Sequence, residues 1–194
     1  MPVGRPRSFD SEKAIERAMR VFWRKGYEGT SLPDLTKAMR INRPSLYAAF
    51  GNKEALFRKV LDHYAEGPAA YVLEALEART SREVADRLLR GAIDLLTDKR
   101  NPGGCLFVQG ALACGDEADS VRNELAQRRT AGEAALRKRL ERAKAEGELS
   151  RSVDHAGLAR FLSTVIQGMA VQAAGGARRP QLEQVADAAL SRWP

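Results

Sequence analysis

Cysteine, histidine and aromatic residues are scarce in this chain of 194 residues. It contains two cysteines, Cys105 and Cys114, two histidines, His63 and His155, and an aromatic fraction of only 6%. Two cysteines cannot build the disulfide framework of a small secreted domain, and the chain has none of the Cys and His spacings that hold zinc. We therefore expect no metal site, no resident cofactor and a reducing, cytoplasmic location.

Long uncharged runs are also missing, with one exception. No apolar segment follows the basic N-terminus, as one would in a signal peptide. The exception is the segment 161–177, which has 17 residues without a charge. It includes Ser163, Thr164 and Gln167, and it is shorter than the roughly 20 residues that span a bilayer. We interpret it as a buried helix at a subunit interface.

Signatures of common enzymes are absent as well. The chain has no HExxH or ExxH run, no GxSxG turn, no GxxxxGK loop and no GxGxxG. Catalysis would have to depend on scattered carboxylates that look like those of any solvated helix face. We therefore expect no catalytic residues, and a helical enzyme is the least supported alternative.

Basic charge is concentrated at the N-terminal end. Residues 1–50 contain ten Lys or Arg against five Asp or Glu, so they carry +5 of the formal net charge of +7. Only +2 remains for the other 144 residues. This asymmetry favours a polyanionic partner for the N-terminal part, although basic surfaces also occur on proteins that bind nothing acidic.

Helical periodicity runs through the chain, and no segment alternates with the period of two that a half-buried strand requires. We predict an all-α fold. The expected helices are at about 10–25, 32–39, 43–49, 52–66, 69–79, 82–98, 104–114, 117–146, 154–174 and 180–192. Gly67 and Pro68 form the expected seam between an N-terminal domain, residues 1–66, and a C-terminal domain, residues 67–194.

The most informative segment is 30–57, TSLPDLTKAMRINRPSLYAAFGNKEALF. It fits a short helix, a turn at 40–42, a second short helix and a third helix start into 28 residues. Thr30 or Ser31 is positioned to cap the first short helix, and Asn42 to cap the second. Architectures with this spacing usually place the second short helix in the major groove of DNA.

These residues resemble the TetR family of bacterial transcriptional regulators. The similarity covers about residues 9–60 and includes GYEGTSLPDL, the short helix INRPSLYAAF and the following GNKEALF. The residues that stand where the signature of that family has them are Tyr47, Phe50, Gly51, Lys53, Glu54 and Leu56. The C-terminal part matches more loosely. Its segment QGMAVQAAGGA, followed by an amphipathic helix, is similar to the dimerisation helices of one branch of the family.

The resemblance implies a helix-turn-helix domain that binds double-stranded operator DNA. The helix starts at Thr30 and Ser31 and at Lys53 offer backbone N–H groups that suit phosphates. Arg43 opens the second short helix, from where it can reach a guanine base. Tyr47 and Lys53 correspond to backbone contacts of the family. The expected DNA contacts are Thr30, Ser31, Arg43, Pro44, Ser45, Tyr47 and Lys53.

Several of these residues have a simpler role open to them. Arg43 can contact phosphate only, Tyr47 can serve mainly in packing, and Lys53 can be an ordinary solvated cap. Arg5 and Arg7 either enter the minor groove or belong to a basic tail. Sequence alone leaves these alternatives open.

Arg40 departs from the family pattern. The family often has glycine at this position of the turn, where the backbone can require a positive φ. A residue other than glycine in the left-handed conformation costs about 1–2 kcal/mol. We expect the motif to form all the same.

One helix-turn-helix unit covers too little DNA for specificity, so we expect a homodimer that reads a palindromic site. Helices 154–174 and 180–192 would form a four-helix bundle with their mates. The expected interface residues are Phe161, Leu162, Val165, Met169, Leu182, Val185 and Leu190. The alternative is that these side chains belong to the core of one chain.

The resemblance also implies a small-molecule effector that changes the separation of the two DNA-reading heads and lowers operator affinity. The candidate lining residues, which are mostly polar or aromatic positions inside apolar helices, are Phe107, Gln109, Leu112, Ser163 and Gln167. Plain core packing is the alternative for each. Cys105 and Cys114 allow a thiol sensor, against two inert buried cysteines, because no basic cluster stands nearby to lower a thiol pKa.

Taken together, the residues and the resemblance predict a sequence-specific DNA-binding regulator, a repressor released by an effector. A non-specific architectural DNA-binding protein is the other alternative. It would bind with a salt-dependent affinity that hardly varies with sequence, whereas a regulator would protect a discrete palindromic site. The sequence names neither the operator nor the effector, and it does not separate repression from activation.

Overall fold

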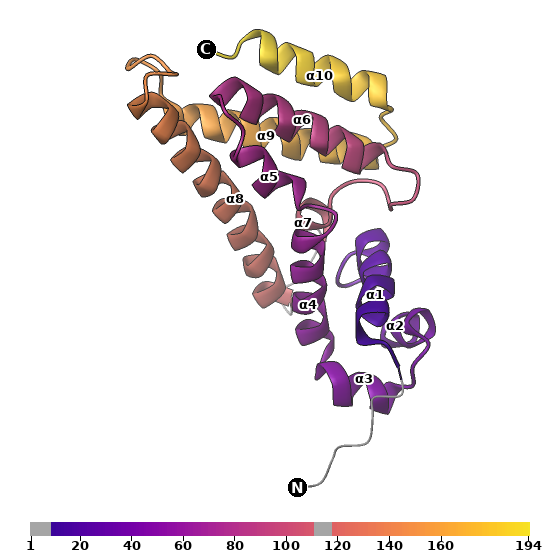
Figure 1. Ribbon diagram of the computed structural model, residues 1–194. Helices are drawn as coiled ribbons and strands as arrows, with labels where there is room; N and C mark the ends of the chain where they lie inside the picture. The colour runs from indigo at the N-terminus through magenta and orange to yellow at the C-terminus, as the bar shows by residue number, and fades with distance from the viewer. Residues whose placement is uncertain (1–8, 111–117) are drawn as a thin grey trace, which may run out of the picture.

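The computed structural model describes residues 9–110 and 118–194, and every regular element in these two ranges is a helix (Figure 1). The helices are α1 (Ser11–Lys25), α2 (Leu32–Met39), α3 (Arg43–Phe50), α4 (Lys53–Glu66), α5 (Tyr71–Leu76), α6 (Ser81–Thr97), α7 (Leu106–Gln109), α8 (Asp119–Ala145), α9 (His155–Ala174) and α10 (Arg179–Ser191). The predicted all-α fold is confirmed. Two helices are shorter than expected. Residues 69–79 form only the six residues of α5, and the described part of the predicted helix 104–114 contains only the four residues of α7.

Polar side chains fix where the first four helices begin. Asp10, Ser31, Asn42 and Asn52 each accept a hydrogen bond from a backbone N–H in the first turn of the helix that follows. Such caps satisfy N–H groups that have no partner within the helix. Of the two residues proposed to cap α2, Ser31 does so and Thr30 does not. The Asn42 cap is confirmed.

An apolar core holds α1 to α4 together. The rings of Phe22 and Phe57 meet edge to face, with centroids 4.8 Å apart. Leu46 and Phe50, on the inner side of α3, are buried in the same core as Leu35 of α2. A helix as short as α3 is marginal in isolation, so these contacts keep it folded.

The core of the N-terminal helices continues past the expected seam into residues of α6, α7 and α8. Two hydrogen bonds reinforce this connection. The indole Nε1–H of Trp23 donates to the carbonyl of Gly104 at 2.9 Å, and the backbone N–H of Tyr27 donates to the carbonyl of Gly110 at 2.9 Å. One carbonyl lies before α7 and the other follows it. The two hydrogen bonds therefore connect α1 and the loop after it to both ends of α7.

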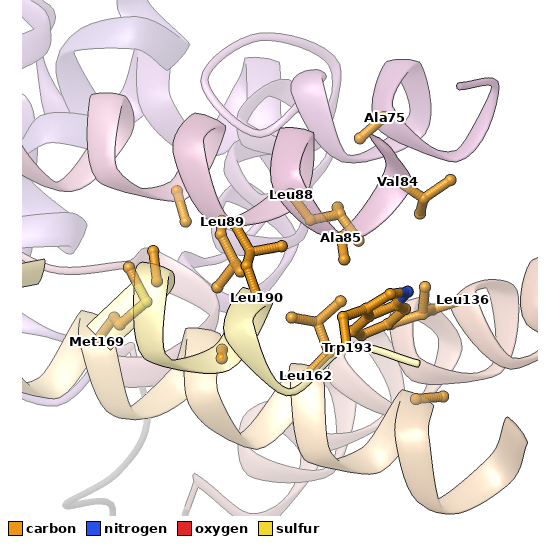
Figure 2. Packing of buried hydrophobic residues seen from close by; sticks show 14 of the residues in the cluster. Ala75, Val84, Ala85, Leu88, Leu89, Leu136, Leu162, Met169, Leu190 and Trp193 are labelled. Atoms are coloured by element: carbon orange, nitrogen blue, oxygen red, sulfur yellow. The ribbon is translucent and has the colours of Figure 1, made fainter. Parts of the chain in front are cut away.

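A second core lies between α6, α8, α9 and α10. Figure 2 shows Leu190 beside Leu89 of α6, and Trp193 beside Leu162 of α9 and Leu136 of α8. The C-terminal helix therefore packs on its own chain. In the part of the chain that the structure describes, no helix is long and apolar enough to cross a membrane.

Four of the seven residues predicted to face a second copy are in this second core. They are Leu162, Met169, Leu182 and Leu190, which are at most 7% exposed. The prediction is wrong for these four because α10 covers α6 and α9 of the same chain. Phe161 and Val185 do point outward, with 45% and 41% of their surface exposed, and Val165 is half-buried.

Arg40 adopts the left-handed conformation that its place in the turn suggests. Its φ is 58° and its ψ is 42°, and within residues 9–110 and 118–194 it is the only residue other than glycine with a positive φ. The backbone N–H of Arg40 still bonds to the carbonyl of Thr36, so the end of α2 is regular. The turn therefore forms despite the conformational cost at Arg40.

Replacing Arg40 by glycine should stabilise the protein. Relief of the left-handed conformation is worth about 1–2 kcal/mol, and the greater freedom of glycine in the unfolded chain offsets part of it, leaving about 0.5–1 kcal/mol. Urea unfolding followed by circular dichroism measures the difference. Lys37→Gly, at an exposed position inside α2, is the control and should lower stability by about 1 kcal/mol. A loss of stability in Arg40→Gly would mean that the Arg40 side chain contributes more than its conformation costs.

Candidate nucleic-acid interface

Helix α3 lies at the tip of the molecule, between α2 and the start of α4 (Figure 1). One side of α3 is buried, and the other side presents Arg43, Pro44, Tyr47 and Ala48 to solvent. Ser45 is half-buried, and its backbone N–H is held by the Asn42 cap at 2.8 Å. The exposed side of α3 is thus rigidly placed and bears small side chains around one arginine and one tyrosine.

Arg43 and Tyr47 lie one helical turn apart and touch each other. The guanidinium carbon of Arg43 is 5.7 Å from the centroid of the Tyr47 ring, and Nη2 is 3.5 Å from its hydroxyl. Tyr47 is 43% exposed, so packing within the chain does not account for this ring. The pair forms a surface that combines a cation, an aromatic face and a hydroxyl group.

The start of α2 holds a reciprocal pair of side chains. Ser31 and Asp34 form a capping box, in which the Asp34 carboxylate accepts from the backbone N–H of Ser31 at 3.1 Å. Lys25 approaches the same carboxylate at 2.8 Å. Hydrogen bonds from Lys25 and then Ser31 hold the pKa of Asp34 well below its usual range. An anion at this helix start would therefore meet Lys25 and the Ser31 hydroxyl beside an ionised carboxylate.

Thr30 does not belong to this surface, contrary to expectation. Its side chain is fully buried, and its hydroxyl donates to the carbonyl of Gly26 at 2.6 Å. The residue closes the loop between α1 and α2 from the inside. Sequence could not separate Thr30 from Ser31, because both residue types are common caps and only one of the two faces outward.

The start of α4 holds Lys53 over an aromatic ring. Nζ of Lys53 is 4.3 Å from the centroid of Tyr27, which itself packs on Phe57 at 5.2 Å between centroids. A cation over an aromatic face is held more firmly than a solvated lysine. Lys53 is therefore positioned by the core. Tyr27, which the sequence did not single out, is the residue that positions it.

A cavity of about 280 Å³ lies between α4, α5, α6, α7, α8 and α9. It takes in three of the five predicted effector-pocket residues, Phe107, Ser163 and Gln167. Gln109 does not line it, because its side chain lies against Gly104. Leu112 falls outside the described residues, and no structure is assigned to it.

Cys105 also lines this cavity. The hydroxyl of Tyr64 donates to its Sγ at 3.3 Å. Burial raises the pKa of the Cys105 thiol, and a protonated thiol is a poor nucleophile and metal ligand. Cys114 falls outside the described residues. Among the residues that are described, no three His, Cys, Asp or Glu side chains are grouped so that they could hold a metal ion.

An apolar groove runs between α9 and α10 on the outer surface. Phe161 and Val165 line it from α9, and Gln184, Val185 and Ala188 line it from α10. These residues include the three predicted interface positions that are not buried, namely the exposed Phe161 and Val185 and the half-buried Val165. The groove is shallow and largely apolar, as expected of a surface that another helix would cover.

Comparison with known proteins agrees with this geometry. Residues 14–60 match the model of the bacterial regulatory proteins of the tetR family. Residues 85–190, more than half of the chain, match the tetracyclin repressor-like C-terminal domain. The first match spans most of α1, all of α2 and α3 and the first half of α4, and the second runs from within α6 into the last turn of α10.

Similar proteins extend over almost the whole chain. The HTH-type transcriptional repressor ComR of Escherichia coli K12 is 36% identical over 98% of this chain and 92% of its own. The uncharacterized HTH-type regulator YezE of Bacillus subtilis 168 is 32% identical over 97% of this chain and 98% of its own. A cysteine mutant of the TetR family regulator CifR, solved with 26-bp double-strand operator DNA, is 43% identical, with a TM-score of 0.94 over 98% of this chain and 100% of its own. The exposed α3, the helix starts beside it and these matches together place the chain in the TetR family of bacterial transcriptional regulators.

Proposed function

We propose that this protein is a transcriptional repressor that binds a palindromic operator as a homodimer and leaves it when a small molecule binds. The exposed side of α3, with Arg43 and Tyr47 at its centre, is the observation on which the proposal rests. The relative in Escherichia coli is named a repressor, and the CifR structure holds operator DNA. A protein of this family with a DNA-reading helix at its tip is best explained by operator binding.

On DNA, α3 would lie in the major groove with its exposed side against the bases. Arg43 would leave the Tyr47 ring and donate to the O6 and N7 atoms of a guanine. Pro44, Ser45 and Ala48 are small enough to allow a close approach. Tyr47 would donate its hydroxyl to a phosphate and so fix the register of the helix.

Two further groups would hold the DNA backbone on either side of α3. Lys53 adds a full charge to the partial positive charge of the α4 start. Ser31, at the start of α2, would donate its hydroxyl after exchanging its bond to Asp34, and Lys25 would offset the charge of that carboxylate. We expect the α4 start to be the stronger phosphate site, because Asp34 occupies the α2 start.

The homodimer would form through the outer groove of α9 and α10. Phe161, Val165 and Val185 leave an apolar strip there that a single chain does not cover. Two copies related by a two-fold axis would bury both strips in a four-helix bundle. The four buried leucine and methionine residues would support this surface from below without touching the partner.

The effector would bind in the cavity that Phe107, Ser163 and Gln167 line. Its walls include Tyr64 of α4 and Phe107 of α7, which also pack on the DNA-binding helices. A ligand in this cavity would therefore press on the elements that hold α1 and α4. The outcome would be a different separation of the two DNA-reading heads.

Two rival functions have less support. A non-specific architectural protein would need only cations, whereas the exposed side of α3 also carries groups that can read bases. Catalysis would require grouped reactive side chains, and the charged groups near the cavity are mostly engaged in ion pairs. We expect a regulator without enzymatic activity that acts in the cytoplasm.

The double variant Tyr47→Ala, Lys53→Ala should lose operator binding. The variant removes a hydroxyl contact of Tyr47 and a charged contact of Lys53 to phosphate. Loss of both should weaken binding by about 3 kcal/mol, which raises the Kd roughly 100-fold. Fluorescence anisotropy on a selected operator measures the change, and circular dichroism and sedimentation show whether fold and oligomeric state persist. Lys138→Ala, which removes an exposed cation from α8, is the control. Unchanged binding by the double variant would remove these residues from the DNA surface.

Arg43→Ala should relax specificity more than it lowers overall affinity. A bidentate contact to guanine discriminates against other bases by about 1–3 kcal/mol, whereas a phosphate contact weakens all sequences equally. Selection of bound sequences from a random pool, with wild type and variant side by side, gives the preference at each base pair. A loss that is equal for every sequence would make Arg43 a phosphate contact only.

Phe161→Glu and Val185→Glu should each convert the dimer into monomers at micromolar concentration. A carboxylate in the centre of an apolar interface loses its hydration and lies near the same carboxylate of the second copy. Burying it costs several kcal/mol. Analytical ultracentrifugation reports the mass. Leu73→Glu serves as the control, because Leu73 is an apolar residue that is 68% exposed on α5, away from the groove. Dimers that persist in both variants would place the interface elsewhere.

A further inference from the structure

The walls of the cavity are mostly apolar, and they come from six helices. The aliphatic side chains that line it lie on α5, α6, α7, α8 and α9, and two tyrosines and a phenylalanine complete it. Four neutral polar side chains interrupt this lining, namely Tyr64, Tyr71, Ser163 and Gln167, and the hydroxyl of Tyr64 already donates to Cys105. The hydroxyl of Tyr71 is protonated at neutral pH and can donate a hydrogen bond, and burial raises the pKa of Tyr71 still further. A ligand here needs an apolar body and one polar end.

Three charged side chains also line the cavity, all from α8. Arg128 is neutralised twice, by Asp62 of α4 at 2.7 Å and by Glu124 at 2.8 Å. Glu133 pairs with Arg160 of α9 at 3.3 Å. These two residues have their opposite charges in place before any ligand arrives.

Arg129 is different. Among the described residues no carboxylate lies within the 4.0 Å of a salt bridge to its guanidinium, and its Nη1–H donates to the backbone carbonyl of Phe107 at 2.7 Å. A carbonyl dipole compensates a full positive charge only in part. Among the described residues that line the cavity, Arg129 is therefore the one charged side chain, half-buried, without an oppositely charged group in salt-bridge range.

We propose that the cavity binds an amphipathic anion, a molecule with one carboxylate on a compact apolar body, and that Arg129 recognises its charge. The inference rests on the proposed role of the cavity as effector site and adds the chemical class of the effector. A guanidinium offers a planar fork of donors that matches the two oxygens of a carboxylate, and the bonds are stronger because both partners are charged. Tyr71, Ser163 and Gln167 line the same cavity and can supply further neutral hydrogen-bond donors to the ligand.

The hydrogen bond between Arg129 and Phe107 indicates how ligand binding would affect the DNA-binding helices. A ligand carboxylate competes with the Phe107 carbonyl for Arg129, so binding loosens the tie between α8 and α7. The carbonyls on either side of α7 are those that accept from Trp23 and Tyr27. A displacement of α7 would thereby reach α1 through the Trp23 bond and the loop after α1 through the Tyr27 bond.

Three probes that share one skeleton and differ in charge test the chemical class. They are 3-phenylpropanoate, 3-phenylpropanamide and 3-phenylpropylammonium. Isothermal titration calorimetry with the free protein should give a Kd of roughly 1 mM or tighter for the carboxylate, a fair value for a ligand of this size. We expect the amide to bind about tenfold more weakly, and the ammonium ion more weakly still. Equal or tighter binding of the amide or the ammonium ion, or no binding of the carboxylate at about 10 mM, would overturn the proposal.

Two neighbouring variants test the residue. Arg129→Gln should bind the carboxylate about tenfold more weakly and leave the affinity for the amide unchanged, whereas Arg129→Lys should keep part of the preference. Arg128→Gln is the matched control, because it removes an equal charge from the same wall but one that is already paired. It should keep the preference for the carboxylate. If Arg128→Gln loses that preference and Arg129→Gln keeps it, Arg129 is not the recognition residue. Because each variant is judged by the ratio of two probes, a loss of stability does not imitate the expected result.

Release of DNA is measured separately, by fluorescence anisotropy with each probe added to the protein–operator complex. If the carboxylate binds the free protein through Arg129 and leaves DNA affinity unchanged, the chemical class stands and the role of the cavity in effector response fails. If the amide binds better and releases DNA, the effector site stands and the anionic class fails. The two proposals thus fail in different ways.

Discussion

The structure depends on the way that α7, a helix of only four residues, joins two apolar cores. Tyr64 of α4 stands between Trp23 and Phe107, with ring centroids 4.8 and 4.9 Å away and both contacts edge to face. The Trp23 indole then donates to the carbonyl just before α7. Aromatic pairs of this geometry are directional, and the buried indole N–H would lose its partner if the loop moved. The DNA-binding helices and the cavity therefore share one set of contacts.

This arrangement constrains how a ligand could act. Packed cores do not deform continuously, because even small gaps lose contacts, so a change at α7 favours a second discrete packing of α1 and α4. The ion pair between Arg128 and Asp62 adds a direct tie from α8 to α4. Helix α8 is thus connected with the DNA-binding helices through α7, through this ion pair to α4 and through the apolar core that Val121 and Leu125 share with them. At α7 the partner of the cation Arg129 is a neutral carbonyl, whereas Arg128 is already paired with carboxylates.

Much of the fold could be predicted from the sequence, because the signals that set helix ends are local. Asn42 and Asn52 cap helices through the backbone within three residues of their own positions, and Gly26 and Gly51 end helices with positive φ values. Arg40 is the informative exception. Its αL conformation costs stability, yet the surrounding helices are packed well enough to impose it.

Contacts between distant parts of the chain were predicted less well, and the reason is physical. The apolar pattern of α9 shows that Leu162 and Met169 must be covered, but periodicity does not say whether the cover is α10 or a second copy. The same limit explains why Thr30 was predicted to contact DNA, since the sequence places it at a helix start and its buried position depends on the fold. It also explains why Tyr27 was not singled out, since only the fold brings its ring under Lys53.

The apolar strip of Phe161, Val165 and Val185 depends on the buried residues of α9 and α10 that lie beneath it. Phe161 can face a partner only while Leu162, the next residue, stays locked against α6 and α10. Helix α9 contributes to the core of its own chain and also has apolar side chains exposed on its outer side, and this supports the proposed dimer surface. A helix covered on one side only could carry charges on the other, and this one carries none from Phe161 to Ala174.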